Sequence, residues 1–353
     1  MIEAAFHFPL SGRPGSCQRI GTGHIHETYL VSTEPGARYI VQRLNTAVFP
    51  QPKAMMENYR LYSAWLREHA PGFPLIRYLP CDAGELLYTD SSGACWRAYP
   101  FVPESGCLQQ TDKLEALYQS AYAFGRFIHA LRELPPARLT ETIPHFHDTP
   151  LRFRRLCQAA ERDCAGRRTE TEKELTFAFA REERGGVLQA LRERGELPVR
   201  VTHNDAKLNN VLLHTETGKA ITVIDLDTVM PGLAAWDFGD LIRSGISGYA
   251  EDTAGADLLD SSRFRALLRG YLDGCPDLCP AEIQSLIPGA WTMILECGVR
   301  FLTDYLEGDV YFAVQREKHN LDRAKAQFAL LAELERREKE LNDILCSETK
   351  KLT

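Results

Sequence analysis

Three side chains between residues 203 and 225 have the types and spacing that phosphoryl transfer requires. The stretch begins with His203-Asn204-Asp205, places Asn210 five residues after Asp205, and reaches Asp225 after a further apolar–turn–apolar segment. Protein kinases use such an aspartate to accept the hydroxyl proton of the acceptor, and an asparagine and a second aspartate to bind Mg²⁺. The reaction needs a well-placed nucleophile and neutralised phosphate charge. The pattern therefore predicts Asp205 as the base, and Asn210 and Asp225 as ligands of the Mg²⁺ that accompanies ATP.

The segment between these residues can bring them together, because it reads as a β-hairpin. Apolar residues flank the turn TETGK, in which Gly218 suits a tight connection. A hairpin folds its two ends together, so Asp225 is expected beside the loop that carries Asp205. Lys207 is placed to contact the γ-phosphate, or else it is a solvent-exposed lysine. His203 is expected to brace the loop rather than to react.

A second kinase-like phrase, Asp237-Phe238-Gly239, lies 32 residues after Asp205 and beyond the segment TVMPGLAAW. A hairpin cannot return Asp237 to the side of Asn210. We therefore expect Asp237 to be a structural carboxylate at the start of a helix, while Asp225 is the metal ligand.

The segment GTGHIHETY at 21–29 lies between two predicted strands, where the glycine-rich loop of a kinase covers the nucleotide. Gly21 and Gly23 are therefore candidate nucleotide contacts, although His26 occupies the position of the third glycine. A dinucleotide-binding fold is disfavoured because a strand follows where a helix should begin. His24 and His26 could each reach a substrate or lie on the surface.

The third strand of ordinary protein kinases carries a lysine, but the phrase YIVQRLN has Gln42 and Arg43 there. Since side chains alternate along a strand, only one of the two can face the nucleotide, and both remain candidates. Glu57 in the following helix could pair with Arg43 or face solvent. The segment CWRAYPFV corresponds to the hinge between lobes, where the candidate adenine contacts are the backbone groups of Tyr99, Phe101 and Val102.

The order of the predicted elements, strands first and helices later, indicates an α+β fold with a boundary near 102–106. We assign residues 1–103 to an N-terminal nucleotide-binding lobe and residues 104–353 to a C-terminal catalytic lobe. Short strands are predicted at 211–213 and 221–224, and helices at 52–70, 111–133, 150–163, 170–193, 262–272, 281–306 and 318–345.

Composition indicates a soluble enzyme of ordinary polarity. The 353 residues include 44% hydrophobic and 25% charged residues. The net charge of −7 argues against nucleic acid or an anionic membrane as the main partner. Ten cysteines without a CxxC pair are typical of a reduced cytosolic protein. Without a signal-peptide pattern or an 18-residue apolar run, we expect a cytoplasmic monomer that does not bind membranes.

The set HxDx₄N followed by IDxD resembles the aminoglycoside phosphotransferase-like superfamily, which includes choline and homoserine kinases. Within it, the phrases ETIPHFHDTPLRF and ECGVRFLTDYLEGDVYFA are similar to those of the kinases that act on N-acetylhexosamines. The resemblance implies a bilobal protein-kinase-like fold. It also implies ATP- and Mg²⁺-dependent phosphorylation of N-acetylglucosamine or N-acetylgalactosamine at the anomeric hydroxyl, with the sugar bound by His24, Asp205, Arg300 and Tyr311.

Other interpretations of these phrases remain open. Arg300 could instead pair with Asp304 at i,i+4, and Tyr311 could pack at a helix end. Asp304, Glu307 and Asp309 could serve a cationic acceptor, such as an amino alcohol or aminoglycoside. The phrase HFHD at 145–148 could bind a metal, although packing or support of the sugar site is favoured. A catalytically inactive scaffold conflicts with the intact set of Asp205, Asn210 and Asp225.

Overall fold

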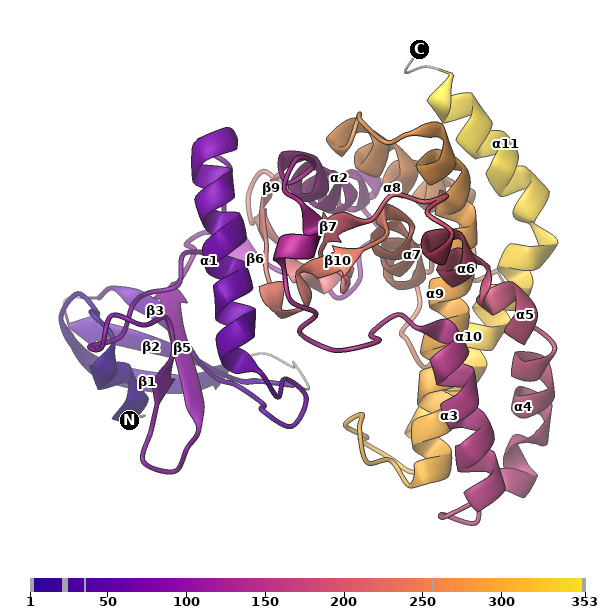
Figure 1. Cartoon of the computed structure of the whole chain (residues 1–353), viewed down its shortest axis with the longest axis horizontal. Helices are drawn as coiled ribbons and strands as arrows, with labels where there is room; N and C mark the ends of the chain where they lie inside the picture. Colours follow the sequence, from indigo (N-terminus) through magenta and orange to yellow (C-terminus); the bar gives the residue numbers. More distant parts are fainter. Residues whose placement is uncertain (1–2, 21–24, 35, 256, 351–353) are drawn as a thin grey trace.

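A computed structural model describes residues 3–20, 25–34, 36–255 and 257–350 of the chain. A β-sheet forms most of the N-terminal part and helices form most of the C-terminal part (Figure 1). This arrangement confirms the α+β, kinase-like fold expected from the sequence. Among the described residues, no helix is both long and apolar enough to cross a membrane.

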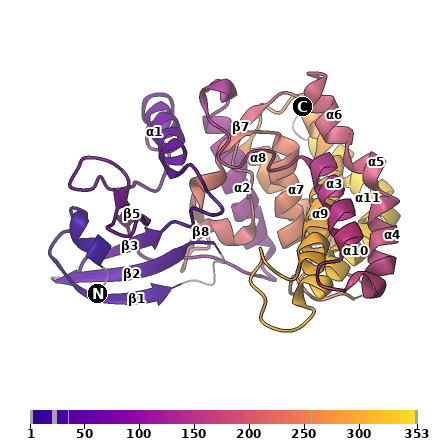
Figure 2. The same ribbon diagram turned by 60° about the horizontal axis from the view of Figure 1, so that its bottom comes forward.

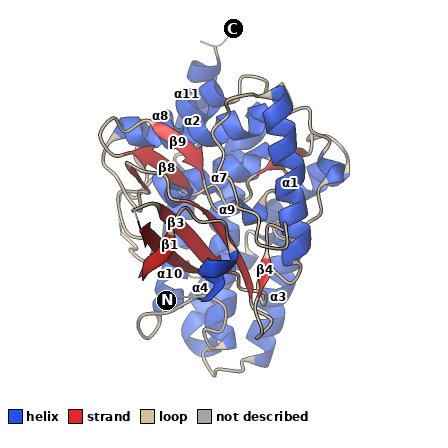
Figure 3. Ribbon diagram, turned by 90° about the vertical axis from the view of Figure 1, so that its left-hand side faces the viewer, coloured by secondary structure: helices blue, strands red, loops and turns tan. Residues whose placement is uncertain are grey.

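The N-terminal sheet is antiparallel, with strand order β1-β2-β3-β5-β4. Its small core contains Val31, Val41, Trp96 and Ala98, of which Trp96 and Ala98 show the two-residue spacing of one face of a strand. In Figure 3 this sheet faces the viewer, and the hairpin of β8 (Val211–His214) and β9 (Ala220–Val223) lies above it. The strands are β1 (Arg13–Ile20), β2 (Glu27–Glu34), β3 (Arg38–Arg43), β4 (Tyr88–Thr89) and β5 (Cys95–Pro100), preceded by the 3₁₀ turn η1 (Glu3–His7).

Helix α1 (Pro52–His69) begins with a proline at its first turn, which suits a helix start. Its buried face, which includes Met56, Tyr59 and Tyr62, belongs to the large hydrophobic core of the helical part. In Figure 2, α1 lies above the N-terminal sheet, and the helices of the C-terminal part lie to its right. The helix is therefore packed against the C-terminal part of the chain, which carries Asp205.

The C-terminal part contains two small sheets. β6 (Ser105–Gly106) pairs with β8 (Val211–His214), which pairs in turn with β9 (Ala220–Val223). β7 (Arg200–Thr202) pairs with β10 (Met230–Gly232). The hairpin β8–β9 matches the predicted strands, whereas β7 and β10 are too short to show a sequence pattern.

The helical part contains a large core around Phe124, Phe238 and Trp291. Two predicted helices are broken: residues 170–193 form three short helices, and residues 318–345 form two. The helices are α2 (Leu114–Ala130), α3 (Thr149–Arg162), α4 (Glu172–Phe179), α5 (Glu182–Gly185), α6 (Val187–Glu193), α7 (Ala234–Gly245), α8 (Ser261–Gly274), α9 (Pro280–Glu307), α10 (His319–Arg336) and α11 (Glu338–Thr349), with the 3₁₀ turns η2 (Pro136–Arg138), η3 (Arg168–Thr171), η4 (Leu208–Asn210) and η5 (Leu226–Thr228).

Candidate active site

The loop between β7 and β8 carries Asp205, whose carboxylate makes its contacts through one oxygen. Oδ2 lies 3.0 Å from Nζ of Lys207 and 2.9 Å from Nδ2 of Asn210. Oδ1 has no hydrogen-bond partner among the described residues. Burial opposes ionisation of this carboxyl, but the Lys207 ammonium outweighs that effect and lowers the pKa of Asp205 below its ordinary value. Asp205 is therefore ionised at neutral pH, with one oxygen open to a hydroxyl proton.

The β8–β9 hairpin brings Asp225 back to Asn210. Val211 pairs with Val223, and the Ile224 amide donates to the Asn210 carbonyl at 2.9 Å. Asp225 then turns the chain with a left-handed φ of 59°. The backbone geometry is therefore the one that the turn TETGK predicts, although the ligand roles of Asn210 and Asp225 stay predictions.

The groups at this point fit a hard divalent cation. Asn210 uses Nδ2 for its side-chain hydrogen bonds to the carbonyl and carboxylate of Asp205, which leaves its amide oxygen without a partner among the described residues. The Asp225 residue is exposed, but the groups around its carboxylate partly desolvate that carboxylate. This desolvation, and then the carboxylates of Asp227 and Asp205, raise the pKa of Asp225. Oxygen donors and surplus negative charge are what Mg²⁺ requires.

Asp237 instead binds the backbone at the start of the loop that carries Asp205. Its fully buried carboxylate accepts the amides of His203 at 2.8 Å and Asn204 at 2.7 Å, and burial raises the pKa of Asp237 to about 6. Phe238 lies in the core. A Cβ on Gly239 would overlap the Gly289 carbonyl of α9. Each residue of this DFG therefore has a packing or positioning role, in agreement with the prediction that Asp237 is structural.

His26 and Asp227 were not assigned together from the sequence, but they are in contact. His26 Nε2 lies 2.7 Å from Oδ2 of Asp227, and His26 Nδ1 accepts the Asn45 amide at 3.0 Å. Because Nδ1 is an acceptor, Nε2 carries the hydrogen and donates it to Asp227. His26, Asp225 and Asp227 are close enough to be considered a metal site. The ring nitrogens of His26 are both committed, however, so a cation would depend on Asp225.

The third strand points Gln42, and not Arg43, toward the lobe boundary. Gln42 Oε1 accepts Nε of Arg97 at 2.9 Å, and Arg97 reaches the C-terminal part. Arg43 is exposed and lies 3.5 Å from Glu27, so Glu57 is not its partner. The predicted contacts Gly21, Gly23 and His24 lie outside the described residues, and their roles stay predictions.

The predicted hinge has one free backbone donor. The Phe101 amide donates to the Arg38 carbonyl at 3.0 Å, and the Val102 carbonyl accepts Oγ of Ser105 at 2.6 Å. The Val102 amide has no hydrogen-bond partner among the described residues. It is therefore the hinge donor best placed for an adenine, whereas Tyr99 lies within the strand ladder, paired with Ile40.

Arg300 and Tyr311 come together at the end of α9. The Arg300 guanidinium carbon lies 5.8 Å from the Tyr311 ring, 5.4 Å from that of Phe312 and 5.5 Å from that of Phe146. No carboxylate pairs with Arg300 among the described residues. Desolvation opposes its charge, but Tyr311 and more distant acids, including Asp205, raise the pKa of Arg300. The two predicted sugar ligands thus share one site, within the electrostatic reach of the predicted base.

Asp304, the other candidate partner of Arg300, instead holds the turn that carries Tyr311. Its Oδ1 accepts the amides of Val310 at 3.0 Å and Tyr311 at 2.7 Å. Its Oδ2 accepts the Phe312 amide at 2.9 Å and Nδ2 of Asn320 at 2.8 Å. The i,i+4 interpretation of Arg300 with Asp304 is therefore wrong, and Asp304 is a buried positioning residue.

His147 of the HFHD phrase supports the catalytic loop. Its Nδ1 lies 3.0 Å from Glu296 and its Nε2 lies 3.0 Å from the Asn204 carbonyl. The Glu296 carboxylate and the Asn204 carbonyl both offer acceptor oxygens, so the ring is held between two hydrogen-bonding groups. Burial opposes the negative charge of Glu296, but the hydrogen bond from His147 lowers the pKa of Glu296 to about 2. The metal interpretation of this phrase is not supported, and the packing interpretation is.

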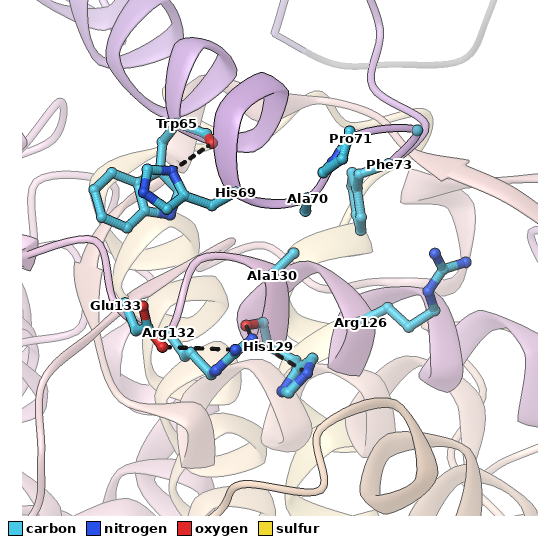
Figure 4. Close-up of a pocket in the computed structure, with 11 residues that line it drawn as sticks. Trp65, His69, Ala70, Pro71, Phe73, Arg126, His129, Ala130, Arg132 and Glu133 are labelled. Carbon is cyan, nitrogen blue, oxygen red and sulfur yellow. Dashed lines mark hydrogen bonds and ion pairs between the residues drawn. The ribbon is translucent and has the colours of Figure 1, made fainter.

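A cavity of about 420 Å³ lies away from these groups, between the ends of α1 and α2 (Figure 4). Trp65 and His69 stack on one side with ring centroids 3.8 Å apart, and Arg126 and His129 lie on the other. Both helices end at this cavity, and cationic side chains are favoured at helix C-termini. Its basic lining is therefore explained without a ligand.

Comparison with known proteins gives one family and one fold. Residues 16–272 match the family described as "Phosphotransferase enzyme family". The uncharacterized kinase-like protein D1044.1 of Caenorhabditis elegans is 29% identical over 190 residues, which cover 50% of this chain and 47% of that protein. The chain therefore matches about half the length of this curated relative.

Three solved structures have the same fold at low identity. An aminoglycoside phosphotransferase from Alicyclobacillus acidocaldarius has a TM-score of 0.61 and 18% identity, covering 100% of this chain and 96% of its own. A microcompartment-associated aminopropanol kinase has a TM-score of 0.65 and 17% identity, covering 96% and 97%. The amicoumacin kinase hAmiN, in complex with AMP-PNP and Ca²⁺, has a TM-score of 0.59 and 14% identity, covering 97% and 92%.

The family match spans most of the chain and includes the HND loop, the β8–β9 hairpin and Asp225. This chain belongs to the phosphotransferase enzyme family.

Proposed function

We propose that the chain transfers the γ-phosphoryl group of ATP to the anomeric hydroxyl of an N-acetylhexosamine in a Mg²⁺-dependent reaction. Family membership supports the reaction type. The AMP-PNP and Ca²⁺ bound to the amicoumacin kinase support a nucleotide with a divalent cation. The sugar follows from the resemblance of the phrases at 141–153 and 296–313, and from the acceptor side described below.

The roles of the polar groups follow from their free atoms. Oδ1 of Asp205 is open to accept the proton of the sugar hydroxyl, and a hemiacetal hydroxyl is more acidic than an ordinary alcohol. Asn210 and Asp225 would hold Mg²⁺, which when bound neutralises charge on the phosphates. Lys207 forms an ion pair with Asp205, and its ammonium group can contact the γ-phosphate instead when ATP is bound.

One observation carries the choice of a neutral acceptor. Two of the three acids that could bind a cationic acceptor are already committed. Asp304 holds four hydrogen-bond donors, and Asp309 pairs with Arg167 at 2.6 Å and with Asn320 at 2.9 Å. Arg300, in contrast, has aromatic neighbours and no acidic partner among the described residues. A guanidinium with free donors suits the hydroxyl and acetamide oxygens of a sugar.

Kinases of amino alcohols and aminoglycosides remain the second candidate class, because the aminopropanol and aminoglycoside enzymes share the fold. For such an acceptor, Glu307 is the acid of the C-terminal phrase that has no hydrogen bond or ion pair among the described residues. One carboxylate is a weak basis for binding a polycation.

The deciding experiment measures ADP release with Mg²⁺–ATP across a panel of acceptors. The panel contains N-acetylglucosamine, N-acetylgalactosamine, glucose, galactose, 1-amino-2-propanol, choline and an aminoglycoside. We expect release with the N-acetylhexosamines and none with their methyl glycosides, in which the anomeric hydroxyl is blocked. Phosphorus NMR of the product should show coupling to the anomeric proton. ADP release with an amine and none with any sugar would overturn the proposal.

A further inference from the structure

A buried ion pair between Arg97 of β5 and Asp227 joins the N-terminal sheet to the C-terminal part. Arg97 is 1% exposed and Asp227 is 2% exposed. The guanidinium is bidentate: NH1 donates to Oδ1, and NH2 donates to Oδ2 at 2.8 Å. Asp227 lies in η5, two residues after Asp225, so the contact joins the sheet to the predicted metal ligand.

Further hydrogen bonds fix Asp227 and Arg97 on every side. His26 donates Nε2–H to Asp227 at 2.7 Å. The Asp227 carbonyl accepts Oγ1 of Thr142 at 2.7 Å. Arg97 donates its Nε to Gln42, the residue at the position of the missing strand-three lysine. The Asp227 carboxylate therefore contacts His26, directly before β2, and Arg97 of β5, which in turn binds Gln42 of β3. These contacts connect the sheet to the loop of Asp225.

Protein kinases also link their N-terminal sheet to the rest of the site by an ion pair. That pair consists of a strand-three lysine and a helix glutamate, and it must be formed for catalysis. This chain has Gln42 at the lysine position, and Glu57 of α1 is exposed. We propose that Arg97 and Asp227 replace that pair, so that Arg97 is a positioning residue that holds Asp225 in place for the metal–nucleotide complex. The inference rests on the proposed use of Mg²⁺–ATP.

A structural role alone does not account for the arrangement. Burying two charges is costly, and a buried ion pair is often no more stabilising than an apolar pair of similar size. Asp225 has a left-handed backbone with φ of 59°, a conformation that non-glycine residues adopt rarely and that its surroundings must hold. The fixed position of Asp227 supplies that support. Arg97 is buried, and three of its five N–H donors are committed to Asp227 and Gln42.

The test measures AMP-PNP binding by calorimetry as a function of Mg²⁺, so it needs no acceptor. Arg97→Met should weaken Mg²⁺–AMP-PNP binding at least tenfold and raise the Mg²⁺ midpoint. Arg97→Lys should recover part of the affinity. The matched control is Arg181→Met, which breaks a bidentate pair with Glu335 (3.0 and 2.7 Å) remote from the site. It should lower the melting temperature and leave the Mg²⁺ midpoint unchanged.

A charge-free double variant, Arg97→Met with Asp227→Leu, separates positioning from stability. It leaves no unpaired buried charge, so its melting temperature should recover relative to Arg97→Met, while its nucleotide binding should stay weak. Recovery of binding together with stability would overturn the inference, as would an unchanged Mg²⁺ midpoint in folded Arg97→Met. An unaltered chain that binds no Mg²⁺–AMP-PNP would overturn the proposed function as well.

Discussion

Replacing Asp304 by asparagine tests whether the turn after α9 forms part of the acceptor site. Asp304 is 3% exposed, and its two oxygens accept three backbone amides and the Asn320 side chain. An asparagine keeps one acceptor oxygen. If that oxygen serves Val310 and Tyr311, the new NH₂ group faces the amide of Phe312 and Nδ2 of Asn320, which are donors. Two of four hydrogen bonds are then lost.

The size of the effect follows from those two bonds. A hydrogen bond to a charged acceptor contributes about 1.5–3 kcal/mol, and a donor that opens to water recovers part of this. We therefore expect the ordered conformation of the turn that presents Tyr311 to Arg300 to be destabilised by about 2–3 kcal/mol. If the acceptor must restore that order, its KM rises by about 30- to 150-fold.

A coupled ADP-release assay measures both substrates. The KM for N-acetylglucosamine should rise by that factor in Asp304→Asn, while the KM for ATP stays within about threefold. The control is Asp309→Asn, which keeps one acceptor oxygen for Arg167 or Asn320 and contacts none of the amides of residues 310–312. A folded Asp304→Asn with an unchanged acceptor KM would refute the assignment of this turn to the acceptor site.

Asp205→Asn should lower kcat by at least about 100-fold, while calorimetric binding of AMP-PNP changes little. Asp225→Asn should abolish Mg²⁺-dependent nucleotide binding without lowering the melting temperature, because it removes a carboxylate that Asp227 and Asp205 repel. Asp237→Asn should lower the melting temperature, and the deficit should be larger at pH 5 than at pH 8. The pKa of Asp237 is raised to about 6, so its contribution to stability declines as the pH rises through that value. Glu296→Gln should cost up to about 3 kcal/mol in urea unfolding at pH 7, because the pKa of Glu296 is lowered from 4.5 to about 2; the difference from the unaltered chain should shrink as the pH falls toward 2.

The parts of the site that sequence could predict are those built by local chain geometry. The turn TETGK specifies a hairpin, and a hairpin specifies that Asp225 returns to Asn210 whatever the rest of the fold does. The same reasoning separates Asp225 from Asp237. Apolar periodicity likewise predicts α2, α3 and α9 within a few residues.

The broken helix at 170–193 shows where periodicity is a weaker guide. One of the two breaks, between α5 and α6, falls at Gly185-Gly186, and glycine has a lower helix propensity than any residue except proline. A Cβ on Gly185 would press on Leu295, Phe153 and Thr149, so close packing requires glycine there. The doublet was a local signal for the break, but helical periodicity continues on both sides and conceals it.

Contacts between distant residues had no local signal. His147 and Glu296 are 149 positions apart, and Arg97 and Asp227 are 130 apart. Local reasoning could state that each buried charge needs a partner, but it could not choose among the available ones. The choice between Gln42 and Arg43 was open for the same reason, because it depends on which face of the sheet meets the C-terminal part.

The rule that a buried charge needs a partner nevertheless narrows the candidates for the partner of Asp227. Arg97 lies between Trp96 and Ala98 in a largely apolar strand, and Asp227 follows Leu226 in the segment VIDLDTVM, whose other charged residue is Asp225. A charge in such a run is expensive unless it is paired. An arginine and an aspartate that both meet this condition, one in a strand of the sheet and one beside the predicted metal ligand, are natural partners. Arg97 and Asp227, which we propose take the place of the kinase lysine–glutamate pair, thus have unusual surroundings that were visible in the sequence.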